Sequence, residues 1–250
     1  MVNVICLKWG DRYDASMVNR LYTMLKKNST KEFILHCVTE DPTGVSDDIN
    51  IINLPDYGLE KWWWKLWILS DELPVDGKCV FLDLDIVIQN NIDTILNFDN
   101  GSDLFVLKAQ WRTTLITKHS PPINSSIIIW NSKCIKGYFK KFFGDPEYYM
   151  FKYRGIDTYL DSEHPNEYNT LPTDWVYCRV WGYDDTVSFE VEQEYYTNYL
   201  YKDLRENEFP LYYLPERMIC LFNGVGDYTN TSGYYIDSRV YDDFESYWSA

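Results

Sequence analysis

Residues 78–89, KCVFLDLDIVIQ, place two aspartates inside an apolar run. A run this rich in Val, Ile, Leu and Phe predicts a buried strand. Residues i and i+2 of a strand point to the same side, so Asp83 and Asp85 can converge on one ion. An unpaired buried carboxylate costs on the order of several kcal/mol. Either a partner compensates the two charges, or the pair lies at the end of the strand and faces a polar cleft.

Up to residue 100, predicted strands and helices alternate. This alternation predicts an α/β fold with a mixed, mostly parallel sheet and helices on both faces. In such a sheet, ligands bind beyond the carboxyl ends of the strands, where Asp83 and Asp85 fall. The predicted strands are 2–9, 32–41, 49–55 and 76–89, and the predicted helices are 15–28, 60–73 and 92–98.

Beyond residue 100 the pattern changes. The region 145–215 is rich in polar, aromatic and turn-forming residues, which predicts irregular structure over much of it. No Pro/Gly-rich linker divides the chain, which favours one domain. We predict strands at 103–109, 124–132, 187–191, 211–215 and 219–223, and a helix at 136–145.

Composition narrows the classes of partner. The formal net charge of −15 gives a surface that repels phosphate backbones, so no nucleic acid partner is expected. The six cysteines form no C-x-x-C pair, and we interpret them as core residues in a reducing compartment. No apolar run reaches the roughly 20 residues of a transmembrane helix, and the N-terminus lacks the pattern of a signal peptide. We therefore expect a cytoplasmic protein without a transmembrane segment.

The aspartate pair admits three interpretations. The first is a clamp for Mg²⁺ or Mn²⁺, because both ions accept carboxylate oxygens and keep coordination positions for substrate phosphates. The second is a phosphatase of the haloacid dehalogenase type, in which Asp83 would be the nucleophile. That motif normally opens its domain, whereas strand–helix units precede it here. The third is structural: the aspartates cap a turn or meet an arginine.

The order of these features resembles the glycosyltransferases of the GT-A fold, in the style of family 8 and family 32. In these enzymes an Asp-x-Asp motif ends a strand after an apolar run like VFLDLDIVI. The resemblance implies a single GT-A, Rossmann-like domain over residues 1–250. Residues 1–135 would form the half that binds the nucleotide sugar. Residues 136–250 would form the acceptor-side half, with a C-terminal loop for metal and diphosphate.

The resemblance also implies which residues bind the donor. The loop after the first strand would face the base and ribose, with Tyr13 stacking on the base and Asp11 binding a ribose hydroxyl. Lys65 occupies the position of a basic residue that reaches the donor, and a lysine suits phosphate as a point charge. Asn124 and Ser125 would hydrogen-bond hydroxyls of the donor sugar. The full implied donor set is Lys8, Trp9, Gly10, Asp11, Tyr13, Lys65, Asp83, Asn124, Ser125, Gly224 and Gly226.

By the same resemblance, Mn²⁺ or Mg²⁺ would be held by Asp83, Asp85 and Asn223. Asn223 stands where the family carries a histidine, and an amide oxygen binds Mn²⁺ more weakly than an imidazole does. Asp227 falls around the position of the family's diphosphate-binding lysine, so a positive charge is missing there. These two departures separate the chain from the usual family pattern.

The implied reaction moves a hexose from a nucleoside diphosphate sugar, UDP- or GDP-linked, to a hydroxyl of a glycan or another acceptor. The metal ion and Lys65 would stabilise the departing diphosphate. The resemblance implies retention of the anomeric configuration, and for an inverting enzyme Asp157 is the candidate base. The departures at Asn223 and Asp227 keep a second class open, namely a non-catalytic sugar-binding protein on a decayed GT-A scaffold.

Overall fold

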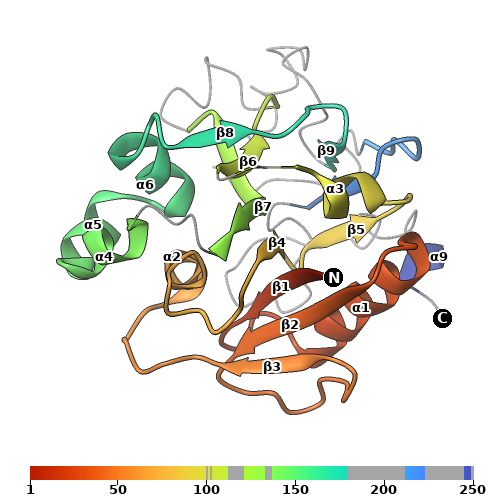
Figure 1. Cartoon of the computed structure of the whole chain (residues 1–250), viewed down its shortest axis with the longest axis horizontal. Helices are drawn as coiled ribbons and strands as arrows, with labels where there is room; N and C mark the ends of the chain where they lie inside the picture. The colour runs from red at the N-terminus through yellow and green to blue at the C-terminus, as the bar shows by residue number, and fades with distance from the viewer. Residues whose placement is uncertain are drawn as a thin grey trace, which may run out of the picture.

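The computed structural model describes residues 1–99, 101, 103–111, 121–132, 137–179, 212–222 and 245–248. Two sheets organise this part of the chain (Figure 1). The larger sheet contains β1 (Val2–Lys8), β2 (Phe33–Thr39), β3 (Asn50–Asn53), β4 (Lys78–Leu82), β6 (Leu104–Lys108), β7 (Ile123–Asn131) and β8 (Tyr168–Thr170). The smaller sheet contains β5 (Ile86–Ile88), β9 (Val176–Cys178) and β10 (Ile219–Leu221).

The large sheet is mixed and mostly parallel. Its strand order is β3-β2-β1-β4-β7-β6-β8. The strands β3, β2, β1 and β4 pair in parallel, as do β6 and β8. β7 runs antiparallel to both of its neighbours. The fold class predicted from the alternation of strands and helices is confirmed.

Helices cover both faces of the large sheet. The alternation of side chains along β1 explains how. Val4 and Cys6 join one core with residues of α1 (Ala15–Asn28), and Ile5 joins the opposite core with residues of α2 (Trp64–Ile68). The remaining described helices are η1 (Lys61–Trp63), α3 (Asp93–Asn97), α4 (Tyr138–Phe143), α5 (Pro146–Lys152), α6 (Ile156–Glu163) and α9 (Glu245–Trp248).

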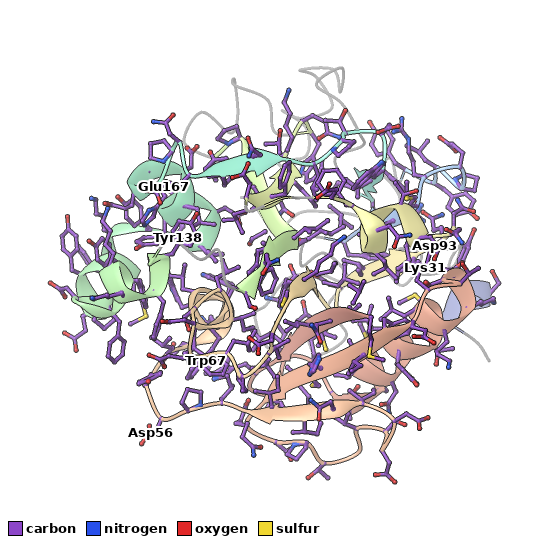
Figure 2. All side chains as sticks on the ribbon, viewed as in Figure 1. Lys31, Asp56, Trp67, Asp93, Tyr138 and Glu167 are labelled. Atoms are coloured by element: carbon purple, nitrogen blue, oxygen red, sulfur yellow. The ribbon has the colours of Figure 1, made fainter. Side chains whose placement is uncertain are left out.

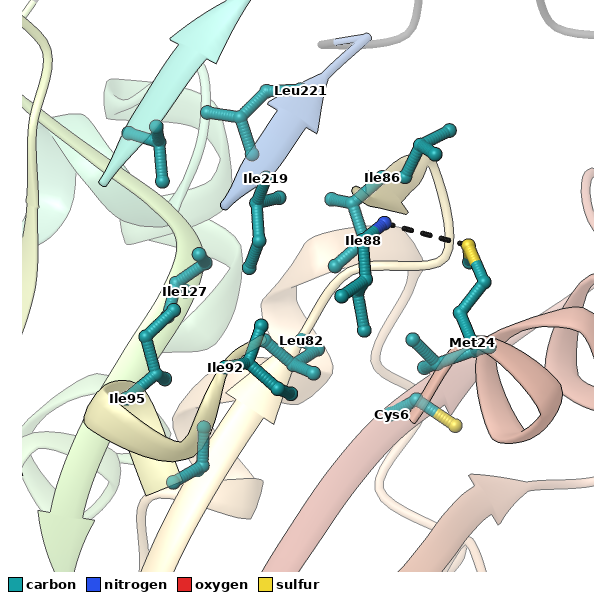
Figure 3. Close-up of a cluster of buried hydrophobic side chains, with 14 of the residues drawn as sticks. Cys6, Met24, Leu82, Ile86, Ile88, Ile92, Ile95, Ile127, Ile219 and Leu221 are labelled. Carbon is teal, nitrogen blue, oxygen red and sulfur yellow. Dashed lines mark hydrogen bonds between the residues drawn. The ribbon is translucent and has the colours of Figure 1, made fainter. Parts of the chain in front are cut away.

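The small sheet packs onto the same core as α1, as Figure 3 shows. The backbone N–H of Ile88 in β5 lies 3.4 Å from the sulfur of Met24 in α1. Leu82 of β4 and Ile127 of β7 belong to the same buried cluster. One apolar core therefore fixes the small sheet, α1 and the large sheet relative to one another.

Aromatic packing fixes α2 on the other face. The ring of Trp63 stacks on that of Phe142 in α4, with centroids 5.1 Å apart. The Tyr138 hydroxyl of α4 donates to the Glu167 carbonyl at 2.8 Å, and Figure 2 shows these two residues close together. The Trp63 ring also lies 6.3 Å from that of Tyr159 in α6, so η1, which leads directly into α2, is held against α4 and α6.

Four predictions are corrected. The predicted strand 76–89 is divided between β4 and β5, because its second half pairs with β10 rather than with the large sheet. The predicted helix 60–73 is shorter and comprises η1 and α2. The region 145–215, predicted as irregular, contains α5, α6, β8 and β9 within its described part. Tyr212–Pro215 is not a strand, and 187–191 lies outside the described residues.

Two further observations concern the described residues. The five described cysteines are buried, as predicted, and none of them is in a disulfide within the described part of the chain, while Cys134 lies outside it. Within the described ranges, no helix is both long enough and apolar enough to cross a bilayer.

Candidate active site

The site begins at the point where the strand order of the large sheet reverses. β1 pairs in parallel with β2 on one side and with β4 on the other. The carboxyl ends of β1 and β4, at Lys8 and Leu82, therefore meet at one edge of the sheet. In open α/β sheets, ligands bind in the crevice outside such a switch point. The loop after β1 and the Asp83–Asp85 segment both leave the sheet there.

The backbone of the aspartate segment is held by both sheets. The N–H of Asp83 donates to the Ser126 carbonyl of β7 at 2.9 Å. The N–H of Phe222, which directly follows β10, donates to the Asp85 carbonyl at 3.0 Å. The two aspartates therefore lie where the chain passes from the large sheet to the small one.

Lys65 compensates the charge of Asp83. Its ammonium lies 2.7 Å from Oδ1 of Asp83, and the two side chains are 7% and 23% exposed. The same ammonium donates to the Ser125 carbonyl at 3.0 Å. Burial raises the pKa of Asp83 and the charge of Asp85 raises it further, while Lys65 lowers it. The partner of Asp83 is thus a lysine from α2 rather than an arginine or a turn.

Ser125 links this ion pair to α6. Its backbone N–H donates to Oδ1 of Asp157 at 3.0 Å. Asp157 lies in the first turn of α6, and the N-cap of that helix is Gly155, so Asp157 is not the cap. We call Asp83, Lys65, Ser125 and Asp157 the polar cluster. It connects β4, α2, β7 and α6 at the edge of the sheet.

Asn124 and Ser126 complete the start of β7. The Asn124 side-chain oxygen accepts the Ser126 backbone N–H at 3.0 Å. Both residues are buried, with 7% and 4% of their surface exposed. The sequence indicated Asn124 and Ser125 but not the role of the Ser126 carbonyl, because that role depends on the antiparallel register of β4 and β7.

The loop after β1 has contacts of its own. The Lys8 ammonium donates to the Asp41 carbonyl at 3.0 Å. Gly10 has φ +63°, a left-handed conformation that favours glycine. The Arg12 guanidinium lies 5.2 Å from the centre of the Tyr13 ring, and Asp11 is exposed. The structure thus places this predicted donor loop at the site edge, and its contacts with a nucleotide stay a prediction.

A small hollow lies beside Asp85 on the side of α1. The two aspartates therefore have different surroundings. Asp85 borders the hollow, and the carboxylate of Asp83 faces Lys65. The hollow is lined by Met17, Arg20, Met24, Leu84, Asp85, Ile86, Val87 and Phe222.

The predicted third metal ligand and the diphosphate loop cannot be placed beside these residues. Asn223, Gly224 and Gly226 lie outside the described residues, immediately after Phe222. Within the described ranges, no group of three or more His, Cys, Asp or Glu side chains is arranged to hold a metal ion. The described part of the candidate metal site therefore consists of Asp83 and Asp85.

This sheet, with a polar site at its switch point, has the architecture of the GT-A glycosyltransferases, so the resemblance noted in the sequence is confirmed at the level of the fold. Compared by sequence, the chain matches no family model and no curated protein.

Three solved structures illustrate the likeness. The galactosyltransferase LgtC, in complex with donor and acceptor sugar analogs, is 13% identical at a TM-score of 0.60, covering 96% of this chain and 94% of LgtC. The glycosyltransferase GlyE of Streptococcus pneumoniae TIGR4 is 10% identical at a TM-score of 0.61, covering 91% of this chain and 56% of GlyE. Mouse xyloside xylosyltransferase 1 is 12% identical at a TM-score of 0.52, covering 89% of this chain and 98% of that one.

The chain thus spans little more than half the length of GlyE but nearly the whole of LgtC. At these identities the likeness establishes the fold alone.

Proposed function

We propose that this chain is a metal-dependent glycosyltransferase, which moves a hexose from a nucleoside diphosphate sugar to a hydroxyl of a glycan or another acceptor. The observation that carries the proposal is the position of Asp83 and Asp85. They leave the sheet at its switch point, within a fold shared with glycosyltransferases. The cytoplasmic location predicted from the sequence belongs to the same proposal.

The two carboxylates of Asp83 and Asp85 suit Mn²⁺ or Mg²⁺ as metal ligands. Two carboxylates lie close enough for the charge of Asp85 to raise the pKa of Asp83, and carboxylate oxygens are ligands that both ions accept. When bound, the ion supplies a Lewis acid for the departing diphosphate. Asp83 and Asp85 would hold it, with Asn223 as the proposed third ligand.

The main proposed role of Lys65 is to orient Asp83. Its ammonium holds the Asp83 carboxylate in one orientation and offsets its charge. An oriented ligand binds a metal better because less conformational freedom is lost on binding. A contribution of Lys65 to the charge of the diphosphate, as implied by the resemblance, would act from this position.

Asp157 and the start of β7 would position the sugar. Asn124 and Ser125 offer amide and hydroxyl groups, which can both donate to and accept from sugar hydroxyls. Asp157 fixes the backbone of Ser125 and lies beside it. For the retaining reaction that we propose, no dedicated base is needed. For an inverting reaction, Asp157 is the candidate base.

A donor screen tests this function. Release of the nucleoside diphosphate would be measured for UDP- and GDP-hexoses with and without Mn²⁺, in the wild type, Asp85→Ala and the exposed control Asp48→Ala. We expect turnover that requires metal in the wild type and control and is lost in Asp85→Ala. Equal turnover in all three proteins would overturn the proposal.

A binding titration with sugars and an assay of phosphomonoester cleavage, added to the screen, separate the two alternatives. A non-catalytic sugar-binding protein would bind sugars regardless of metal and release no diphosphate. A phosphatase would cleave simple phosphomonoesters and leave nucleotide sugars intact.

A further inference from the structure

Three consecutive tryptophans of the sequence have different surroundings. Trp63 and Trp64 are core residues, with 5% and 3% of their surface exposed. Trp62 is 37% exposed. Packing in the core accounts for the first two, but it does not account for an indole held at the surface.

Trp62 lies at the rim of the polar cluster. It precedes Lys65 by three residues in the continuous turn of η1 and α2, and residues three apart share a side of such a turn. Its ring also contacts Gly155, the N-cap of α6, two residues before Asp157. The indole therefore bridges the elements that carry Lys65 and Asp157.

The contact with Gly155 orients the ring. A Cβ added to Gly155 would lie 3.0 Å from Nε1 of Trp62, 3.4 Å from Cδ1 and 3.5 Å from Cε2. The two ring atoms bonded to Nε1 are nearly as close to this Cβ position as Nε1 itself, so the Cβ position of Gly155 lies over the face of the ring rather than beyond its edge. One face of the five-membered ring thus rests on a residue without a side chain.

The backbone before Trp62 is strained to hold this position. Lys61 has φ +54°, and it is the one described non-glycine residue with positive φ. A non-glycine residue in this region costs about 1–2 kcal/mol, and such strain concentrates at functional sites. The Lys61 ammonium lies 5.8 Å from the centre of the Trp62 ring.

We propose that Trp62 is the stacking platform for a pyranose ring of the acceptor, an inference that rests on the proposed transferase function. A sugar ring has an apolar C–H face, and the negative face of an indole matches it. The diphosphate of the donor is assigned to Asp83 and Asp85 and the donor sugar to Asn124 and Ser125, whereas Trp62 lies against Gly155 at the start of α6. A sugar ring on Trp62 is therefore assigned to the acceptor.

Binding of methyl β-D-galactopyranoside and methyl β-D-glucopyranoside, measured by saturation-transfer NMR titration, tests this platform without requiring turnover. The variants are Trp62→Ala, Trp62→Phe and Gly155→Ala, in which the added Cβ presses on the indole and shifts it slightly. Phe151→Ala removes an aromatic side chain that is 94% exposed elsewhere on the surface, and it serves as the control.

We expect Trp62→Ala to weaken binding of at least one glycoside about five- to tenfold, the loss of one stacking contact. Gly155→Ala and Trp62→Phe should weaken it less, and Phe151→Ala not at all. Equal binding by the wild type and Trp62→Ala would overturn the platform, as would a wild type that binds neither glycoside.

A parallel titration of the wild type with the UDP- and GDP-hexoses and Mn²⁺ distinguishes the two proposals. Nucleotide-sugar binding combined with glycoside binding insensitive to Trp62→Ala refutes the platform alone. Glycoside binding that depends on Trp62, in a protein that binds no nucleotide sugar, refutes the transferase and with it the acceptor assignment.

Discussion

Asp83 and Asp85 are chemically alike but have different neighbours. Asp83 is paired with Lys65, whereas Asp85 borders the hollow beside α1. A carboxylate held by a lysine is oriented in advance for a ligand.

Removal of the Lys65 charge tests the pairing. Lys65→Met leaves the Asp83 carboxylate beside Asp85 without its cation, and breaking a buried pair costs about 3–5 kcal/mol. Because Asp83 is 23% exposed, we expect a smaller loss, about 2 kcal/mol in the free energy of unfolding by urea.

The exposed Lys31, labelled in Figure 2, provides the control, and Lys31→Met should change the free energy of unfolding by less than about 0.5 kcal/mol. The double variant Lys65→Met/Asp83→Asn should recover part of the loss, because the uncompensated charge is gone. A Lys65→Met protein as stable as the control would argue against the ion pair.

The sequence predicted the candidate site only in part. The apolar run was sufficient to place Asp83 and Asp85 at the carboxyl end of a strand, but both residues follow β4 rather than lie in it, so the alternation of strand side chains does not apply to them. The bonds that join the polar cluster connect residues 18, 60 and 32 positions apart in the chain. Such contacts depend on which strands become neighbours, and no local pattern carries that information.

At the scale of elements, α1 was predicted at its observed bounds, whereas the helix at 60–73 was predicted too long. α1 has a capping aspartate and a regular apolar stripe. The second helix ends early because the Ser70 hydroxyl donates to the Trp67 carbonyl at 2.6 Å and competes with the helical bonds. Apolar spacing continues past Ser70 in the sequence and conceals this end.

The cap of α1 yields a stability prediction. Oδ1 of Asp14 accepts the backbone N–H of Ser16 at 2.9 Å. Asp14→Ala should reduce the free energy of unfolding by about 1 kcal/mol. Asp14→Asn should reduce it much less, because asparagine also caps helices well. Urea unfolding of both variants checks the difference, and equal losses in the two would contradict a capping role.

A histidine on β2 predicts how stability depends on pH. The Nδ1 of His36 accepts from the Asn50 amide at 2.8 Å, and its Nε2 lies 3.0 Å from Oδ1 of Asn3. Burial lowers the pKa of His36, so the unfolded chain binds a proton more readily than the folded one. Stability therefore falls as the pH drops through the unfolded value of about 6.5.

Replacement of His36 by glutamine removes this titration. Between pH 7.5 and 5.5, the free energy of unfolding should fall less in His36→Gln than in the wild type. Burial also lowers the pKa of His164, so part of the decrease should persist in the variant. Identical pH profiles of the two proteins would exclude His36 as a source of the dependence.

For the whole molecule, the alternation of strands and helices was enough to predict the layered architecture. The break between β4 and β5 was not predictable, because apolar residues continue on both sides of Asp83 and Asp85 and no glycine or proline marks a turn between residues 78 and 89. The partner that takes β5 out of the large sheet is β10, more than a hundred residues later in the chain. This break turns the two aspartates away from the strand and into the site.

The net charge of −15 bears on the central claim. An acidic protein repels a diphosphate, so a bound divalent cation at Asp83 and Asp85 should dominate the affinity for a nucleotide sugar. The most direct measurement is a calorimetric titration of the best UDP- or GDP-hexose with and without Mn²⁺, in the wild type and Asp83→Asn/Asp85→Asn. We predict that Mn²⁺ strengthens binding about tenfold or more in the wild type, which corresponds to about 1.4 kcal/mol, and has no effect in the variant. An equal effect of Mn²⁺ on both proteins would contradict the account.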